Sequence, residues 1–216
     1  MRRKTRVIQW ATGAVGRNTV GMISQKQSVE VVGAIVYHRD KVGRDLGEII
    51  GLNKELGVIA SDNADEVLKT EADVVLINTI ASLAENVDQI SKALRAKKNV
   101  ITTVGFMYPW KTYPEISQQI DRLAKENGVS FLGTGLYPGF FSYLPAILTG
   151  GIARVDHITV DYCDDFTEWD TITMVRDKLK IGVPPAEFDK PEVLPNWLAQ
   201  LYAEVVYFIA DYLGWE

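Results

Sequence analysis

One short segment near the N-terminus constrains the fold of this chain more than any other. Residues 7–10 form an apolar run, residues 11–17 read ATGAVGR, and helix-compatible residues continue to Ile23. This pattern predicts a β-strand, a tight turn and the N-terminus of a helix. Gly13 leaves out the side chain where an anion would approach, and Gly16 lets the helix pack closely on the strand. Because N–H groups of a first helical turn attract phosphate, the segment predicts a dinucleotide pyrophosphate site.

The glycine pattern is incomplete, because Ala11 stands where its first glycine is expected. An ordinary strand-to-helix turn is therefore the alternative interpretation. Residues 30–37 are rich in β-branched side chains and predict a second strand, which completes a strand–helix–strand unit of about thirty residues. This spacing favours dinucleotide binding. The residues expected at the pyrophosphate are Gly13, Ala14, Val15, Gly16 and Arg17.

The residues after the second strand bear on the choice of cofactor. An NAD site carries an acidic residue at the end of this strand, where it binds the ribose 2′-hydroxyl. Here the chain continues with Tyr37, His38, Arg39, Asp40 and Lys41. Arg39, helped by His38 or Lys41, suits the 2′-phosphate of NADP. The pattern favours NADP. Asp40 at the ribose would permit NAD, and a solvated polar loop is the third interpretation.

Alternating strands and helices predict an α/β fold with a Rossmann-type doubly wound parallel sheet over residues 1–137. Further strands are expected over residues 58–61, 72–79, 99–104 and 129–135, and helices over residues 64–69, 83–97 and 114–126. Ser61 or Asp62 is the expected N-cap of the first of these helices. Ligands bind at the carboxyl ends of such strands. The predicted cofactor site therefore also includes Asn78, Thr79, Thr103 and Gly135, although Asn78 could simply cap its strand.

Residues 138–216 follow a different pattern and predict a second, α+β domain for substrate binding and dimerisation. A proline–glycine pair opens an apolar helix that ends near Leu148. Residues 155–162 alternate like a half-exposed strand, and residues 197–213 predict an apolar helix. A single strand needs partners. Either residues missing from this chain complete the sheet, or strands from a second subunit complete it. We expect a homodimer.

Composition excludes several classes of function. The formal charge is −5, from 23 basic and 28 acidic residues, which argues against nucleic-acid binding. No segment approaches the ~20 apolar residues of a membrane span, and the basic N-terminus precedes too short an apolar run for a signal peptide. The single cysteine, Cys163, fits a reducing cytoplasm. His38 and His157 lie far apart in the sequence, so no metal site is expected.

Three segments together resemble the dihydrodipicolinate reductase-like superfamily, and more narrowly the branch of 2,4-diaminopentanoate dehydrogenase and the native amine dehydrogenases. They are residues 11–17, residues 40–48 and residues 133–140 (GTGLYPGF), of which the last is the most specific. The resemblance covers residues 6–148. It implies a Rossmann domain, a mixed α/β substrate domain that also makes the dimer contact, and hydride transfer with NAD(P)H at a C–N centre.

Two departures limit what the resemblance implies. True dihydrodipicolinate reductases carry a paired-histidine motif with a nearby lysine, which His38 and His157 do not supply. Amine-dehydrogenase relatives carry a glutamate shortly after the strand that ends near Thr103, whereas residues 104–110 contain no carboxylate. Either the base comes from elsewhere, or the substrate is less polar. Family members are also longer than 216 residues, in line with an incomplete chain.

The predicted activity is NAD(P)H-dependent oxidation or reduction of a small amine, imine or carbonyl compound. Hydride transfer asks the protein for orientation and for a proton donor or acceptor. Tyr108 and Tyr137 are the candidate catalytic residues, with Lys111 as a third. Three acidic residues could bind a substrate ammonium or form a solvated loop: Asp164, Asp165 and Glu168. A non-catalytic dinucleotide-binding sensor or assembly subunit is the alternative function.

Overall fold

The computed structural model describes residues 3–79, 83–161, 163, 165, 180–188 and 196–215. The chain divides into two compact units, Met1–Gly135 and Leu136–Glu216. This division falls two residues before the domain boundary that the sequence predicts. The first unit carries the sheet, and the second consists of helices and extended segments in the described residues.

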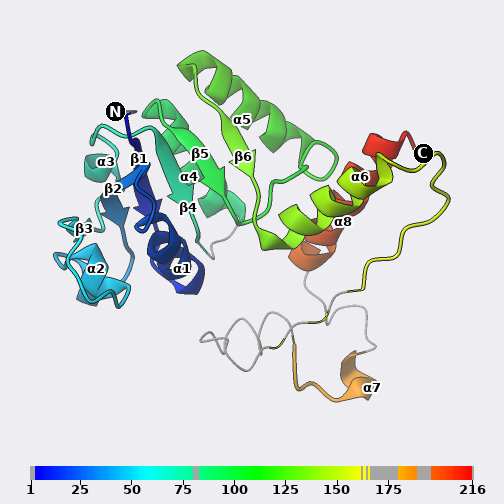
Figure 1. Ribbon diagram of the computed structural model, residues 1–216, viewed down its shortest axis with the longest axis horizontal. Helices are drawn as coiled ribbons and strands as arrows, with labels where there is room; N and C mark the ends of the chain where they lie inside the picture. The colour runs from blue at the N-terminus through cyan, green and yellow to red at the C-terminus, as the bar shows by residue number, and fades with distance from the viewer. Residues whose placement is uncertain are drawn as a thin grey trace. The chain divides into compact units, whose positions relative to one another are not determined.

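The first unit is built on one sheet of six parallel strands (Figure 1). They are β1 (Thr5–Trp10), β2 (Val29–Ile35), β3 (Ala60–Ser61), β4 (Val74–Ile77), β5 (Asn99–Thr102) and β6 (Phe131–Gly133). Their order across the sheet is β3-β2-β1-β4-β5-β6. The chain thus winds outward from β1 in one direction and then restarts beside β1 in the other. This arrangement confirms the predicted doubly wound sheet and places its switch point at the end of β1.

Helices cover both faces of this sheet. They are α1 (Ala14–Ile23), α2 (Leu46–Ile49), α3 (Ala64–Val67), α4 (Leu83–Arg95) and α5 (Pro114–Asn127), with a 3₁₀ turn, η1 (Arg39–Lys41), after β2. Ala34 of β2 belongs to the apolar cluster beneath α1 and α2, whereas its neighbour Ile35 belongs to the cluster beneath α4 and α5. Successive side chains of a strand point to opposite faces, which explains this separation.

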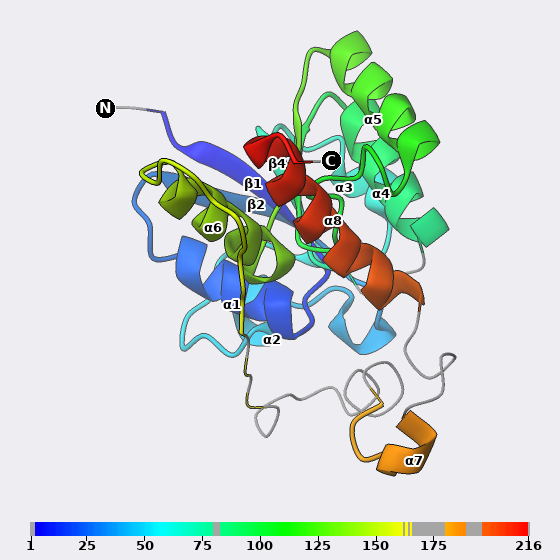
Figure 2. The ribbon, with the colours of Figure 1, turned by 90° about the vertical axis from the view of Figure 1, so that its right-hand side faces the viewer.

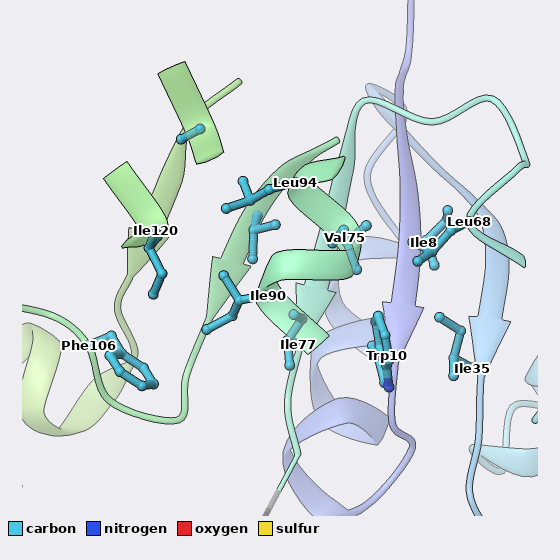
Figure 3. Packing of buried hydrophobic residues seen from close by; sticks show 13 residues of the cluster. Ile8, Trp10, Ile35, Leu68, Val75, Ile77, Ile90, Leu94, Phe106 and Ile120 are labelled. Atoms are coloured by element: carbon cyan, nitrogen blue, oxygen red, sulfur yellow. The ribbon is translucent and has the colours of Figure 1, made fainter. Parts of the chain in front are cut away.

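The larger cluster holds the sheet against α4 and α5. Ile90 and Leu94 lie one turn apart on α4 and reach the buried side chains of the central strands (Figure 3). Its fully buried members include Ile8, Ile77, Ile90 and Leu94. Burial of one such side chain contributes roughly 1.5–3 kcal/mol to the stability of the folded state. The sequence shows the spacing of the apolar residues in α4 and α5. This spacing therefore determines how the two helices pack against the sheet.

The helix ends follow local chemistry, with one correction. Pro114 opens α5, and Gly128 ends it with a left-handed backbone (φ +66°), as predicted. The N-cap of α3 is Asn63, not Ser61 or Asp62: its side-chain oxygen accepts a hydrogen bond from the Glu66 N–H at 3.2 Å. Ser61 lies two residues before the cap position, and its hydroxyl oxygen accepts a hydrogen bond from the Asn63 N–H instead.

The second unit contains a π-helical turn, η2 (Leu136–Phe140), followed by α6 (Phe141–Thr149), α7 (Pro185–Phe188) and α8 (Asn196–Leu213). Helices α6 and α8 lie side by side (Figure 2). Tyr143 and Phe208 meet edge to face, with ring centroids 5.4 Å apart. The predicted helix at residues 197–213 is thus present. None of the described helices combines the length and hydropathy that a bilayer crossing requires.

The strand predicted at residues 155–162 is not formed. Residues 155–161 belong to no helix or strand, and Tyr162 lies outside the described residues. Their alternating pattern suits a strand, but a strand exists only where a neighbour accepts its backbone hydrogen bonds. The described part of the second unit offers no such neighbour.

Candidate functional site

The turn between β1 and α1 contains two glycines with different roles. Gly13 is the N-cap of α1, and a Cβ at this position would meet no atom within 4 Å. A Cβ at Gly16 would collide with the carbonyl oxygen of Ala11. Gly16 is therefore required by packing within the protein, whereas the space at Gly13 is not filled by the protein. The N–H groups of the first turn of α1 face that space with the positive end of the helix dipole.

Ala11 takes the conformation that the missing first glycine would have supplied. Its backbone is left-handed (φ +72°), which costs a non-glycine residue about 1–2 kcal/mol. Two hydrogen bonds hold it there. The Ala11 N–H donates to the Ile35 carbonyl at 2.8 Å, and the Gln9 side-chain amide donates to the Ala11 carbonyl at 2.7 Å. The turn therefore keeps the shape of the dinucleotide fingerprint without its first glycine.

A cation reaches this turn from the segment after β2. The Lys41 Nζ donates to the Thr12 carbonyl at 3.2 Å and lies 3.3 Å from the Thr12 hydroxyl oxygen. Lys41, the last residue of η1, is half-buried, whereas Arg39, its first residue, and His38, its N-cap, are exposed. The strand itself ends at Ile35, two residues earlier than predicted. One of the three predicted cations thus contacts the glycine turn, and the other two remain on the surface of the 3₁₀ turn.

A chain of buried amides runs along the carboxyl edge across β1, β4 and β5. The Gln9 Nε2 lies 2.9 Å from the Asn78 Oδ1, and the Asn78 Nδ2 donates to the Thr103 hydroxyl oxygen at 2.9 Å. Gln9 and Asn78 are buried and Thr103 is half-buried. Sequence reasoning missed Gln9. Its signal was a polar amide inside an apolar strand, two residues before a turn whose carbonyls need donors.

A second polar network lies on the α4 side of the same edge. The Thr79 hydroxyl is 3.0 Å from the amide oxygens of both Asn86 and Gln89. The Gln89 Nε2 and the Trp10 Nε1 both donate to the Tyr37 hydroxyl, at 2.8 and 2.7 Å. Partial burial raises the pKa of Tyr37, so this phenol is neutral at pH 7. Thr79 therefore engages α4 with its side chain.

Above this network is a hollow of about 460 Å³. Its walls come from the ends of β1, β2 and β3 and from the first turns of α4. They are formed by Trp10, Tyr37, Asp62, Ala64, Ala84, Glu85, Asp88, Gln89 and Lys92. The indole and phenol rings offer flat apolar surfaces, and the carboxylates offer acceptors for hydroxyl groups. Such a combination suits a nucleoside.

The ends of β5 and β6 form the other side of the edge. A Cβ at Gly133 would collide with the Phe106 carbonyl oxygen, so the chain after β5 passes directly over β6. Gly105 and Phe106 both have positive φ, +96° and +59°, which makes this crossing a tight turn. Thr103 and Gly135 are adjacent here: a Cβ at Gly135 would lie 3.6 Å from that of Thr103. These two predicted site residues therefore come together.

The two predicted catalytic tyrosines belong to different units of the chain, and their catalytic role stays a prediction. Tyr108 is half-buried in the segment after β5, and Lys111 nearby is exposed. Tyr137 lies in η2, and its side chain is outside the described residues, as are Asp164 and Glu168. Arg17 and Asp165 are exposed. No group of three potential metal ligands occurs among residues with a described position, and Cys163 is a free, exposed thiol.

A further buried carboxylate escaped the sequence reasoning. Glu204 is only 1% exposed on α8, a helix that packs against α6 and η2. Its signal was its place in the heptad-like stripe with Leu201 and Phe208, where an apolar residue is expected. Buried carboxylates are rare, because removing the charge from water is costly unless it is paired.

Comparisons with known proteins agree with this architecture. Residues 7–132 match the family model described as dihydrodipicolinate reductase, N-terminus. The 2,4-diaminopentanoate dehydrogenase of Acetoanaerobium sticklandii is 33% identical over 99% of this chain and 61% of its own length. The amine dehydrogenase of Streptomyces virginiae is 26% identical over 97% of this chain and 59% of its own length.

A solved structure extends the likeness to the fold. The amine dehydrogenase from Mycobacterium smegmatis is 30% identical and matches with a TM-score of 0.73, over 94% of this chain and 61% of that one. The chain therefore spans about three fifths of the length of these relatives. With more than half of its residues matched by the family model, the chain belongs to the dihydrodipicolinate reductase N-terminal domain family, in the branch of 2,4-diaminopentanoate dehydrogenase and the amine dehydrogenases.

Proposed function

We propose that this chain binds NADP(H) or NAD(H) and belongs to an oxidoreductase that transfers hydride to or from a small amine, imine or carbonyl compound. One observation carries the proposal: the β1–α1 turn, where Gly13 leaves open space in front of a helix N-terminus. The names of the relatives, an amine dehydrogenase and a 2,4-diaminopentanoate dehydrogenase, support the reaction class.

In this proposal the dinucleotide lies along the carboxyl edge of the sheet. The pyrophosphate takes the N–H groups at residues 14–16, because the Arg17 N–H already donates to the Gly13 carbonyl at 2.8 Å. The Lys41 ammonium beside Thr12 supplies the counter-charge. The adenosine takes the hollow lined by Trp10 and Tyr37. The nicotinamide half reaches Asn78, Thr103 and Gly135, since dinucleotides bind across the switch point of such sheets.

NADP is the proposed preference. Residues 36–39 after β2 contain no carboxylate, and Arg39 and His38 lie exposed on the turn that follows. An exposed guanidinium can bind a 2′-phosphate with two parallel hydrogen bonds. A carboxylate at the ribose would instead favour NAD. Asp40 on η1 could supply it, as could Asp62, Glu85 or Asp88 in the lining of the hollow.

When bound, the nicotinamide supplies hydride transfer at carbon. The protein must orient the substrate and move one proton, for which Tyr108 and Tyr137 remain the proposed residues. In the oxidative direction the amine loses a hydride and a proton, and addition of water to the imine releases ammonia and a carbonyl compound. A reducing, cytoplasmic location is part of the proposal, supported by the absence of a second cysteine.

The substitution Gly13→Val tests dinucleotide binding directly. The valine side chain would fill the phosphate position, yet no protein atom lies within 4 Å of its Cβ, so the domain should fold. Calorimetric titration with NADPH should show loss of binding, with circular dichroism unchanged. Gly21→Val on the same helix is the matched control, because it also has no atom within 4 Å and should bind as the wild type does. Wild-type affinity in a folded Gly13→Val protein would refute the proposed site.

A non-catalytic dinucleotide sensor or assembly subunit is the second candidate. It is favoured by the lack of any carboxylate in residues 104–110. NADPH oxidation measured against a panel of ketones with ammonia separates the two. Turnover with any member supports the oxidoreductase, whereas cofactor binding without turnover on the whole panel supports the sensor.

We also propose that the chain forms a homodimer through the second unit. Helices α6 and α8 leave large apolar side chains exposed on the faces that do not pack together. They are Leu144, Ile147, Leu148, Tyr202, Val206, Tyr207 and Tyr212. Large exposed apolar side chains on two neighbouring helices suit an interaction site, and a two-fold axis would cover them with a second copy.

A further inference from the structure

The hydrogen bonds of the amide chain at the carboxyl edge run in one donor-to-acceptor direction. This direction follows from the orientation of Gln9. The Ala11 and Trp10 carbonyls accept hydrogen bonds and donate none. The Gln9 side chain lies 2.7 Å from the first and 3.2 Å from the second, so its NH₂ group must point at them. Its other atom, the Oε1, is buried and has no hydrogen-bond partner among the described residues. Gln9 thus leaves an acceptor unsatisfied in order to donate to the turn.

The orientation of Gln9 determines that of Asn78. Because the Gln9 Nε2 also lies 2.9 Å from Asn78, the Asn78 side chain must present its oxygen there. Its NH₂ group is then the atom that faces Thr103, and it donates to the Thr103 Oγ1 at 2.9 Å. The Thr103 oxygen is therefore an acceptor in this bond. Its own proton must be directed elsewhere.

No described protein acceptor takes the Thr103 proton. The neighbouring Thr102 behaves differently, since its hydroxyl donates to the Ile77 carbonyl at 3.1 Å inside the sheet. Thr103 lies beyond the end of β5, next to the bare backbone of Gly135 with its φ of +132°, and its side chain is half-buried. A hydroxyl group that accepts in one bond, and whose proton no described protein acceptor takes, can donate to a ligand.

We propose that Gln9 and Asn78 are positioning residues that commit Thr103 to donate a hydrogen bond to an acceptor oxygen of the bound ligand. This inference rests on the proposed function, under which that oxygen is the carboxamide carbonyl of the nicotinamide. Thr103 is two strand spacings, about 10 Å, from the end of β1. It therefore lies away from the pyrophosphate turn, on the side of the switch point that receives the second nucleotide.

The experiment compares two ligands that differ only in the nicotinamide. NADPH contains it, and 2′-phospho-ADP-ribose ends at the ribose. For each variant, calorimetry gives the NADPH affinity divided by the 2′-phospho-ADP-ribose affinity. Changes at the phosphates cancel in this ratio. Thr103→Val should lower the ratio by about threefold to tenfold, the effect of one lost hydrogen bond. Thr103→Ser should keep it. Thr102→Val is the matched control and should also keep it, because the Thr102 proton is used inside the sheet.

Asn78→Asp tests the direction of the chain. A carboxylate accepts from Gln9 and from the Thr103 hydroxyl, so it captures the proton that the ligand needs. The ratio should fall as far as in Thr103→Val, and the double variant should fall no further. An unchanged ratio in Thr103→Val or in Asn78→Asp would overturn this inference while leaving dinucleotide binding intact. Failure of the wild type to bind either ligand would overturn the proposed function, and this inference with it.

Discussion

At the scale of single residues, three positions determine the shape of the β1–α1 turn: Ala11, Gly13 and Gly16. Gly16 is required by contact with the Ala11 carbonyl, whereas Gly13 faces open space, where we propose that the pyrophosphate binds. Neither reason applies to Ala11. Ala11 adopts a left-handed backbone because Gln9 and Ile35 hold its carbonyl and its N–H. These hydrogen bonds maintain the backbone strain at Ala11. A substitution that relieves the strain therefore measures its free energy.

Ala11→Gly should raise the free energy of unfolding by about 1 kcal/mol, because glycine adopts positive φ without a Cβ penalty. Urea unfolding would show a higher midpoint with the same slope. The Gln9 and Ile35 hydrogen bonds involve backbone atoms of residue 11 and remain available. A lower midpoint would mean that the Ala11 methyl contributes packing that exceeds the strain.

Arg39→Ala tests the choice of cofactor. Loss of a charge-assisted bond to the 2′-phosphate should weaken NADPH binding by about tenfold to a hundredfold and leave NADH binding nearly unchanged. Asp40→Ala, one residue along the same exposed turn, is the control and should not weaken NADPH. Equal losses for both cofactors in Arg39→Ala would exclude a role at the 2′-phosphate.

At the scale of elements, Asp45 joins a short helix to the loop that follows it. Its carboxylate is the N-cap of α2 and accepts hydrogen bonds from the N–H groups of Gly47, Leu56 and Val58, at 2.7, 2.9 and 3.1 Å. Partial burial alone would raise the pKa of Asp45, but these donors favour the carboxylate and hold the pKa below its usual value. A four-residue helix gains its stability from such contacts rather than from its own length.

Asp45→Asn should lower the free energy of unfolding at pH 7 by about 1–3 kcal/mol, because charge-assisted hydrogen bonds are lost. The pKa of Asp45 is lower in the folded than in the unfolded chain. Its contribution is therefore complete above the unfolded value of about 4 and disappears as the pH falls through the folded value. Urea unfolding at a series of pH values should show the gap between wild type and variant narrowing below about pH 4. A gap that stays constant would argue against the carboxylate.

Elements with strong periodicity could be predicted from the sequence. Helix α5, with Pro114 at its start and Gly128 at its end, and the β-branched strand β2 were both recognisable. The strand expected at residues 155–162 was not, because its pattern is local and its pairing would have depended on a neighbour elsewhere. The cap at Asn63 was missed by one or two residues, since several capping residues stand in a row.

The site was predictable only where its chemistry is local. The glycine turn could be read directly, because backbone shape and anion binding arise from adjacent residues. The pairing of Gln9 with Asn78 spans 69 residues and depends on which strands become neighbours. Glu204 was missed although its place in an apolar stripe was a signal. The sequence alone does not show that this face of α8 is buried.

At the scale of the whole molecule, exposed apolar side chains on α6 and α8 bear on assembly. We expect light scattering at micromolar concentration to give twice the chain mass of 24.1 kDa. Val206 and Ile147 are 63% and 72% exposed, so Val206→Asp combined with Ile147→Asp should shift the protein to monomers. Met22→Asp on α1, also 62% exposed, is the control and should leave the mass unchanged. A well-folded wild-type monomer would refute the dimer.

The strand order also divides the sheet into two halves that meet at one junction, here called the seam. Residues 5–61 supply three neighbouring strands and residues 74–133 supply the other three, and only the pairing of β1 with β4 joins them. A chain divided before Asn63 would yield two peptides whose apolar faces are complementary and whose junction carries the Gln9–Asn78 contact. Under the proposed function the dinucleotide would span this seam and bind only the reassembled pair, so by mass action it should drive fragment complementation. Division of the chain at this seam would then give a split-protein reporter for the proposed cofactor.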